Sequence, residues 1–281
     1  MRVTIWGCRG SVPTPGPQTV RYGGNTSCVE VVVDDDSVFV LDAGTGIRGL
    51  GVELQRRGTR LIRLLLTHLH LDHLEGLRFF APLYDDEVTL EIWGPPSPTQ
   101  NLRDRVARSF SPPLFPLELR DVPARVSFHD VPREDWQLDG VSLRADLVVH
   151  PGATVGFRLE TATASLGYIP DHEPALVGDI EGKPLDWLSG SGVAGKVDLL
   201  LHDAQYSEQE YAERIGWGHS SVAHAVSFAH AVDARRLLLF HHEPYHGDDA
   251  LDRLEESARE LDGDESVAPT LAREGMVLEL P

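Results

Sequence analysis

One stretch decides the fold: Ile62-Arg63-Leu64-Leu65-Leu66-Thr67-His68-Leu69-His70-Leu71-Asp72-His73. Its first five residues form a short apolar run that is typical of a buried strand. Side chains alternate along extended backbone, so His68 and His70 lie on one side, and the turn into a following helix brings Asp72 and His73 to a neighbouring point. A surface histidine cluster is the alternative. Donors in this order after a buried strand instead indicate a site for two adjacent cations.

The donor types indicate which metals would bind. Imidazole and carboxylate groups suit Zn²⁺, with Mn²⁺ or Fe as further possibilities. We therefore expect two divalent metal ions, with zinc favoured and manganese plausible. The only cysteines are Cys8 and Cys28, too few for a cysteine-based zinc cluster or a disulfide framework. They could face each other across neighbouring strands, but we expect free thiols.

The rest of the chain repeats the pattern of apolar strands followed by polar residues, which often carry chemistry. Such strands are expected at Val141–Val149, Ser165–Ile169, Val197–Leu201 and Leu237–Phe240, before His150, Asp171, His202-Asp203 and His241. Helices are expected at Ile47–Arg57, Leu74–Leu83, Thr99–Arg108, Ser221–Ala231 and Asp248–Leu261, and loops between Pro112 and Asp139. With 281 residues, 41% of them hydrophobic, the pattern predicts one α/β domain over residues 1–281 with mixed sheets.

The segment His68 to His73 meets the signature HxHxDH and so resembles the metallo-β-lactamase superfamily. The resemblance implies an αββα sandwich, two mixed β-sheets flanked by helices. It also implies one metal held by His68, His70 and His150, a second held by Asp72, His73 and His241, and Asp171 bridging both. His172 and His242 remain competing ligands beside Asp171 and His241.

Within the superfamily the chain looks most like the ribonuclease Z branch and its small-substrate, cyclic-nucleotide phosphodiesterase relatives. Three segments resemble that branch: Leu201–Tyr206 its HEATF segment, Gly218–Ser221 its HST motif, and Leu238–His241 with Pro244 its last metal-ligand strand. Glu243 and Tyr245-His246 depart from its pattern. The flexible arm that grips transfer RNA is missing, because Asp171 follows His150 by only 21 positions. The resemblance also implies a homodimer.

Net charge and hydropathy limit the classes of binding partner and the cellular location that we expect. The formal charge of −19 would repel a polyanion, so a small phosphodiester is the expected partner and extended nucleic acid is unlikely. No uninterrupted apolar run approaches 18 residues, so no membrane span is expected. No secretory signal is visible at the start, so a cytoplasmic location is expected.

The expected catalytic residues are Asp72, His219 and Asp203. Two adjacent cations can hold a bridging hydroxide as nucleophile, with Asp72 close to the phosphorus. His219 would protonate the leaving oxygen, and Asp203 would favour its imidazolium form. A residue beside a helix cap is the alternative for His219, and a turn former at a strand end is the alternative for Asp203.

Weaker signals give four candidates for substrate binding: Asn25, Thr26, Trp217 and His246. An ordinary turn is the more common role for a segment such as Asn25-Thr26, and a core position is the more common role of an aromatic side chain such as Trp217. Together these observations predict a binuclear-metal phosphodiesterase acting on a small cyclic nucleotide. The alternatives are a ribonuclease Z-like RNA 3′-processing endonuclease, a thioester or lactone hydrolase on the same metal centre, and a non-catalytic metal-binding protein.

Overall fold

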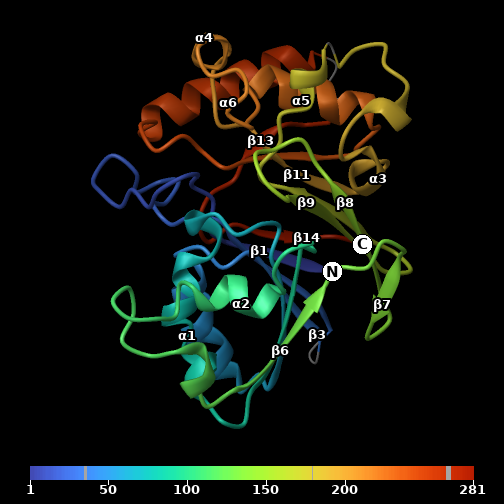
Figure 1. Cartoon of the computed structure of the whole chain (residues 1–281). Helices are drawn as coiled ribbons and strands as arrows, with labels where there is room; N and C mark the ends of the chain where they lie inside the picture. The colour runs from blue at the N-terminus through green and yellow to red at the C-terminus, as the bar shows by residue number, and fades with distance from the viewer. Residues whose placement is uncertain (35–36, 179, 264–266) are drawn as a thin grey trace.

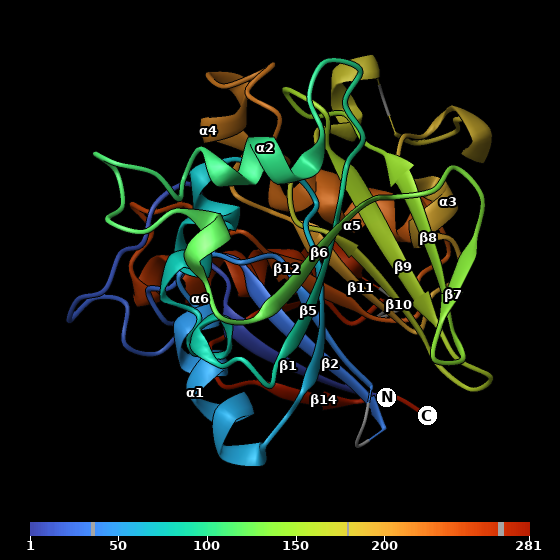
Figure 2. The ribbon, with the colours of Figure 1, turned by 60° about the horizontal axis from the view of Figure 1, so that its bottom comes forward.

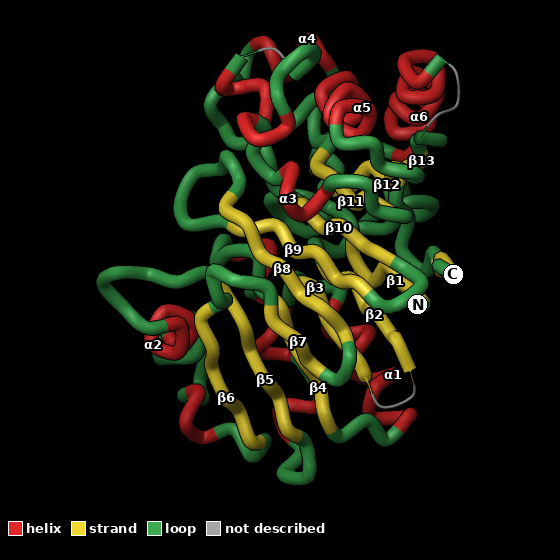
Figure 3. Tube along the Cα trace, turned by 90° about the vertical axis from the view of Figure 1, so that its right-hand side faces the viewer, coloured by secondary structure: helices red, strands yellow, loops and turns green. Residues whose placement is uncertain are grey.

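Two seven-stranded β-sheets face each other, and helices cover their outer faces (Figures 1 and 3). The computed structural model describes residues 1–34, 37–178, 180–263 and 267–281. This layered arrangement confirms the αββα sandwich expected from the sequence.

The first sheet is built from the N-terminal half of the chain and one C-terminal strand, in the order β14-β1-β2-β3-β4-β5-β6. Strands β14, β1, β2 and β3 pair antiparallel, and β3, β4, β5 and β6 pair parallel. The strands are β1 (Arg2–Gly7), β2 (Cys28–Asp34), β3 (Ser37–Leu41), β4 (Leu61–Leu65), β5 (Thr89–Gly94), β6 (Arg125–Asp130) and β14 (Val277–Glu279).

The second sheet has the order β13-β12-β11-β10-β9-β8-β7 and repeats this division. Strands β7 to β10 pair antiparallel, and β10 to β13 pair parallel. The strands are β7 (Trp136–Leu138), β8 (Val141–Leu147), β9 (Val155–Glu160), β10 (Ser165–Ile169), β11 (Leu199–Asp203), β12 (Leu237–Phe240) and β13 (Thr270–Leu271). In both sheets the parallel strands end at the same edge. The polar residues that follow these strands therefore lie close together.

The core between the sheets is aromatic and aliphatic. Phe39 of the first sheet and Phe157, Tyr168 and Phe240 of the second are fully buried in one cluster. Burying one such side chain stabilises the fold by about 1.5–3 kcal/mol. Cys8 also lies in this cluster, and both cysteines are buried free thiols, as expected.

Helices pack on each outer face through apolar stripes. On the first sheet, α1 (Ile47–Arg57) buries Leu50 and Leu54 and ends at Gly58, whose φ of 72° is readily adopted by glycine. Helix α2 (Leu102–Ala107) lies on the same side and is capped by the Asn101 side chain (Figure 2). The second sheet carries α3 (Ser191–Ala194), α5 (Val222–Ala231) and α6 (Asp248–Asp262), with α4 (Glu208–Ala212) farther out.

Several expected elements differ from the structure. Instead of a helix at Leu74–Leu83, three 3₁₀ turns occur at Leu71–His73, Glu75–Phe79 and Ala81–Tyr84. Gly76 packs directly on the Gly44 carbonyl, and Pro82 lacks an amide hydrogen, so a continuous α-helix is interrupted. The region 112–139 contains β6 and β7, edge strands that local patterning did not reveal.

Strand β11 ends two residues later than expected, so His202 and Asp203 belong to the strand itself. Among the described residues, no helix is long and apolar enough to cross a bilayer.

Candidate metal centre

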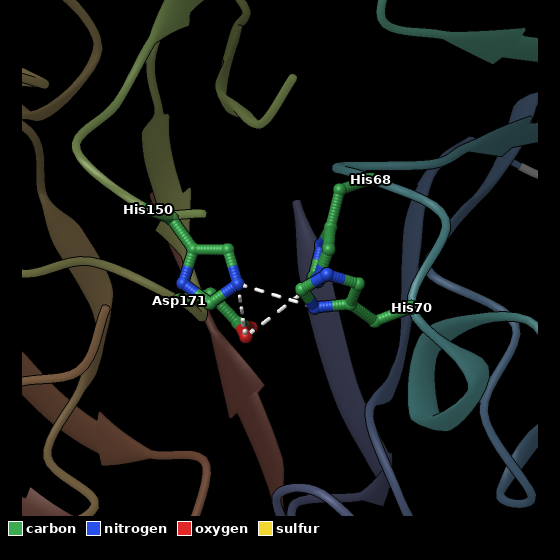
Figure 4. A group of neighbouring side chains, drawn as sticks. All are labelled: His68, His70, His150 and Asp171. Carbon is green, nitrogen blue, oxygen red and sulfur yellow. Dashed lines mark hydrogen bonds and ion pairs between the residues drawn. The ribbon is translucent and has the colours of Figure 1, made fainter. Parts of the chain in front are cut away.

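Seven histidine and aspartate side chains meet where the parallel strands of the two sheets end. The donor atoms of His68, His70, His150 and Asp171 all lie within 4.8 Å of one another (Figure 4). A second set within the same limit consists of Asp72, His73 and His241. We call His68, His70 and His150 the outer group, and Asp72, His73 and His241 the inner group. These are the seven residues that the sequence analysis singled out as metal ligands.

Asp171, which follows β10, lies between the two groups. Its Oδ2 atom lies 3.7 Å from His68 Nε2 and 3.6 Å from His150 Nε2. Its Oδ1 atom lies 3.0 Å from His73 Nε2 and 3.4 Å from His241 Nε2. One carboxylate oxygen therefore faces each group, which is the arrangement that a bridging ligand requires.

The buried donors fit metal ions. His68 Nε2 is buried without a hydrogen-bond partner, which is costly unless another group binds it. Burial lowers the pKa of His68 well below its usual value, so its imidazole is neutral and keeps a lone pair. Burial alone would raise the pKa of Asp171, but the neighbouring imidazoles hold it well below its usual range. Neutral imidazoles and ionised carboxylates are the forms that bind Zn²⁺ or Mn²⁺.

Hydrogen bonds orient the rings so that Nε2 faces the centre. His73 donates from Nδ1 to Asp42 over 2.8 Å, and His150 donates from Nδ1 to the Gly218 carbonyl over 2.8 Å. Each bond fixes the tautomer and leaves Nε2 as the ligand atom. Gly218 cannot be larger, because a Cβ there would lie 2.5 Å from His150 Nδ1 and its φ is +93°.

Asp42 follows β3 directly and braces the metal centre, although the sequence did not single it out. It accepts hydrogen bonds from the Thr67 amide, from His73 Nδ1 and from the Tyr168 hydroxyl over 2.8, 2.8 and 2.9 Å. Burial, together with the Asp42 carboxylate, raises the pKa of Tyr168 well above its usual value, so the hydroxyl remains a donor. Asp42 thus joins both sheets directly behind the ligands.

His219 lies against both groups. Its ring centroid is 5.1 Å from that of His150 and 4.9 Å from that of His241. Nδ1 donates to Asp203 Oδ2 over 2.7 Å. Burial alone would lower the pKa of His219, but the Asp203 carboxylate raises it to about 9. The imidazolium form is therefore favoured, and in that form Nε2 is also protonated.

Asp203 is itself held by the backbone. It accepts hydrogen bonds from the amides of His172 and Gln205, each over 3.0 Å. The Gln205 side chain in turn receives a hydrogen bond from His241 Nδ1 over 3.3 Å. The pair His219 and Asp203 is thus built into the same framework as the inner group.

The two competing ligands lie outside the centre. His172 contacts His202 through Nδ1 over 2.9 Å, on the side of the second sheet that faces Phe228. His242 donates to the Ala272 carbonyl over 2.8 Å, and burial lowers its pKa to about 3. The geometry therefore favours Asp171 and His241 over their neighbours.

The four candidate substrate-binding residues are placed differently. The Asn25 side chain donates to Glu274 over 3.0 Å, and Thr26 is buried with its hydroxyl accepting from the Thr45 amide. His246 is bonded to Glu210 over 2.8 Å. Trp217 is 62% exposed on the loop that leads to His219. The polar groups of Asn25, Thr26 and His246 thus already have hydrogen-bond partners within the protein. Substrate binding by all four residues stays a prediction.

Glu173 is a buried residue that the sequence analysis did not single out. Its carboxylate accepts hydrogen bonds from the Gly216 and Gly218 amides over 2.8 and 2.7 Å, and from the Tyr211 hydroxyl over 3.0 Å. It anchors the loop whose Gly218 carbonyl orients His150. Its position after Asp171 was the available signal, but a glutamate near a ligand has no distinguishing pattern.

Comparison with known families agrees with this geometry. A profile of the Beta-lactamase superfamily domain matches residues 38–242, and the chain belongs to this superfamily. It is a metal-dependent hydrolase.

The chain is similar to ribonuclease Z of Mycobacterium sp. (strain KMS), with 28% identity over 260 residues that cover 87% of this chain and 85% of the relative. It is also similar to ribonuclease Z of Haloferax volcanii, with 26% identity over 317 residues covering 100% and 95%. The short form of human tRNase Z has the same fold, with a TM-score of 0.67, 21% identity and complete coverage of both chains.

These relatives correct one expectation. The charge of −19 suggested a small phosphodiester as the partner and made extended nucleic acid unlikely, but the matching relatives are named ribonuclease Z, an enzyme of RNA. That expectation was wrong because net charge sums the whole surface, whereas a nucleic acid meets a local region whose potential can have the opposite sign. The expected homodimer and cytoplasmic location stay predictions.

Proposed function

We propose that this protein hydrolyses phosphodiester bonds of ribonucleotides at a binuclear metal centre. The proposal rests on the pair of His219 and Asp203. His219 Nδ1 lies 2.7 Å from Asp203 Oδ2, and the His219 ring contacts a ring of each donor group. Hydrolysis of a phosphodiester releases an alkoxide, which needs a proton. A buried imidazolium beside the ligands meets that need.

The outer group would hold one divalent ion and the inner group the other, with Asp171 between them. Zinc is favoured by the imidazole-rich donor set, and manganese is the alternative. When bound, two such ions neutralise charge on the phosphate and supply a water of lowered pKa. Asp72 would be a metal ligand close to the phosphorus. The Ser11 amide donates to its Oδ2 over 2.7 Å and fixes the carboxylate in place.

The chain's own contribution to the reaction is proton transfer. His219 donates from Nδ1 to Asp203, which leaves Nε2 as the nitrogen that passes a proton to the leaving oxygen. Such a general acid contributes roughly 10²–10⁴-fold to the rate. Thioester hydrolysis has less need of this group, because a thiolate is a stable leaving group; this favours phosphodiesters over acyl substrates.

RNA is the first candidate substrate, and the relatives named ribonuclease Z support it. A cyclic nucleotide is the second, favoured by the short connection between His150 and Asp171. That connection holds only β9, a turn and β10. The match to the Haloferax volcanii protein extends over 317 positions against 281 residues here, so that relative contains residues this chain lacks.

A substrate panel tests the proposal. The protein loaded with Zn²⁺ or Mn²⁺ would be given precursor transfer RNA, 2′,3′- and 3′,5′-cyclic nucleotides, bis(p-nitrophenyl) phosphate and a thioester. We expect turnover of phosphodiesters, and the RNA or cyclic substrate with the highest kcat/KM identifies the class. Turnover of the thioester alone would refute the proposal, as would inactivity towards every phosphodiester.

A further inference from the structure

A cavity of about 390 Å³ adjoins the outer group. The segment that carries His68 and His70 lines it, and so do the end of α2 and the residues that follow that helix. Pro151–Ala153, directly after His150, complete the lining. Cavities of this size hold small organic ligands, and this one opens beside the proposed point of reaction.

Part of the lining is apolar. Leu69, Leu71, Leu74 and Leu114 contribute to it. Leu71 is 66% exposed and Leu114 is 68% exposed, although they come from distant parts of the sequence. Two exposed leucines bordering one cavity beside a polar centre suit a flat, weakly polar group such as a nucleobase.

The cavity also contains two guanidinium groups, Arg105 and Arg108. Arg105 is fixed, since its Nη2 donates to the Pro95 carbonyl over 2.6 Å and lies 3.8 Å from Asp130. Arg108 is exposed, and its hydrogen-bond partner is the neutral side chain of Gln100. Within the described ranges of the chain, no carboxylate lies within 4.0 Å of Arg108. A positive charge without a counterion therefore borders the cavity of a chain whose formal charge is −19.

We propose that this cavity is a nucleotide subsite, in which the leucines hold a base next to the scissile phosphodiester and Arg108 binds a second phosphate beyond that nucleoside. This inference rests on the proposed phosphodiesterase activity and narrows its substrate. Guanidinium groups bind phosphate through paired hydrogen bonds. A cyclic mononucleotide has no second phosphate, so the subsite fits a ribonucleotide chain or a dinucleotide with a terminal phosphate.

The test compares Arg108→Ala with Arg103→Ala. Both residues are exposed arginines in the same short segment, so both variants lose one charge, but Arg103 does not line the cavity. The substrates are a diribonucleotide without a terminal phosphate and the same dinucleotide phosphorylated at its 5′ or 3′ end. The measured quantity is the ratio of kcat/KM for the phosphorylated to the unphosphorylated substrate.

We expect the unmodified protein and Arg103→Ala to prefer one phosphorylated dinucleotide by roughly tenfold, the value of one charge-assisted hydrogen bond. Arg108→Ala should reduce that ratio to about one. An unmodified protein without any preference would overturn the subsite. A ratio that Arg108→Ala leaves unchanged would also overturn it. An equal fall of the ratio in both variants would overturn it too, because that result would be a general effect of losing one positive charge.

A binding measurement separates this inference from the proposed function. Titration calorimetry with uridine 3′,5′-bisphosphate should show affinity that Arg108→Ala and Leu114→Ala each reduce and Arg103→Ala retains. Loss of affinity in the first two variants, in a protein that cleaves no phosphodiester, would support the subsite and refute the function. Cleavage without bisphosphate binding would refute the subsite and leave the function standing.

Discussion

The outer and inner groups of donors have the same chemistry but different surroundings. Every member of the inner group is buried, whereas in the outer group His70 is exposed, although the side chains of His68 and His150 are buried. Asp42 braces the inner group through His73, and Glu173 braces the outer group through Gly218 and His150. The inner group is enclosed in the sandwich, and the outer group contributes His68 and His70 to the wall of the cavity. The difference shows that the inner donors are enclosed, whereas the outer donors include one that a substrate could reach, so the two proposed metal positions would differ in access.

The largest expected effect tests whether Asp171 joins the two groups. Asp171→Ala removes the carboxylate that faces both, so we expect metal content to fall from about two ions per chain to near zero. His150→Ala should lose only the outer ion. Elemental analysis of protein purified in parallel measures both contents. If Asp171→Ala kept one ion firmly bound, the two groups would be independent and the carboxylate would not bridge them.

The second effect separates chemistry from metal binding. His219 contacts rings of both groups, yet its proposed role is to donate a proton, so His219→Ala should lower kcat by roughly 10²–10⁴-fold on a substrate with an alkyl leaving group. Metal content should not change. The loss should be much smaller for bis(p-nitrophenyl) phosphate, because p-nitrophenolate leaves without a proton. Equal losses on both substrates would show that His219 acts by another route.

The third effect concerns the brace of the inner group. Asp42→Asn keeps the size of the side chain but weakens acceptance of the His73 hydrogen bond. Substitution of such a supporting residue weakens metal affinity by roughly 10–100-fold. We expect the inner ion to be the more tightly held one because all its ligands are buried, so competition with a chelator should show that Asp42→Asn weakens the tighter of the two binding steps. A change confined to the weaker ion would reverse the assignment of the brace.

The part of this site that the sequence predicted best is one contiguous segment, which contributes to both groups. The ligands between His68 and His73 lie in one segment after a strand, so their spacing alone indicated a metal site, and the strands β10 and β12 have the bounds that their apolar runs indicated. His150, Asp171 and His241 depended on the order of motifs in a family. The braces were not predicted, because Asp42 and His73 are 31 positions apart and Glu173 and Gly218 are 45 apart. Contacts between residues far apart in the sequence form only when the chain folds, so no local sequence pattern predicts them.

The smallest effect concerns the brace of the outer group. Glu173→Gln replaces a carboxylate that accepts three hydrogen bonds by an amide that also carries donors, so the loop before His219 loses part of its anchor. We expect the affinity for the outer ion to fall by about tenfold, near the lower limit for such supporting residues, because His150 keeps its own bond to the Gly218 carbonyl.

Tyr211→Phe is the matched control, since it removes only one of the three donors to Glu173 and leaves both backbone bonds intact. Its metal affinity should stay within about twofold of that of the unmodified protein, an effect of a few tenths of a kcal/mol. Chelator competition measures both variants, and thermal unfolding of the metal-free forms measures any loss of stability. A loss of stability in Glu173→Gln without a change in outer-ion affinity would mean that Glu173 holds the fold and does not position His150. A change in affinity alone would show that the outer group depends on the loop anchored by Glu173, just as the inner group depends on Asp42.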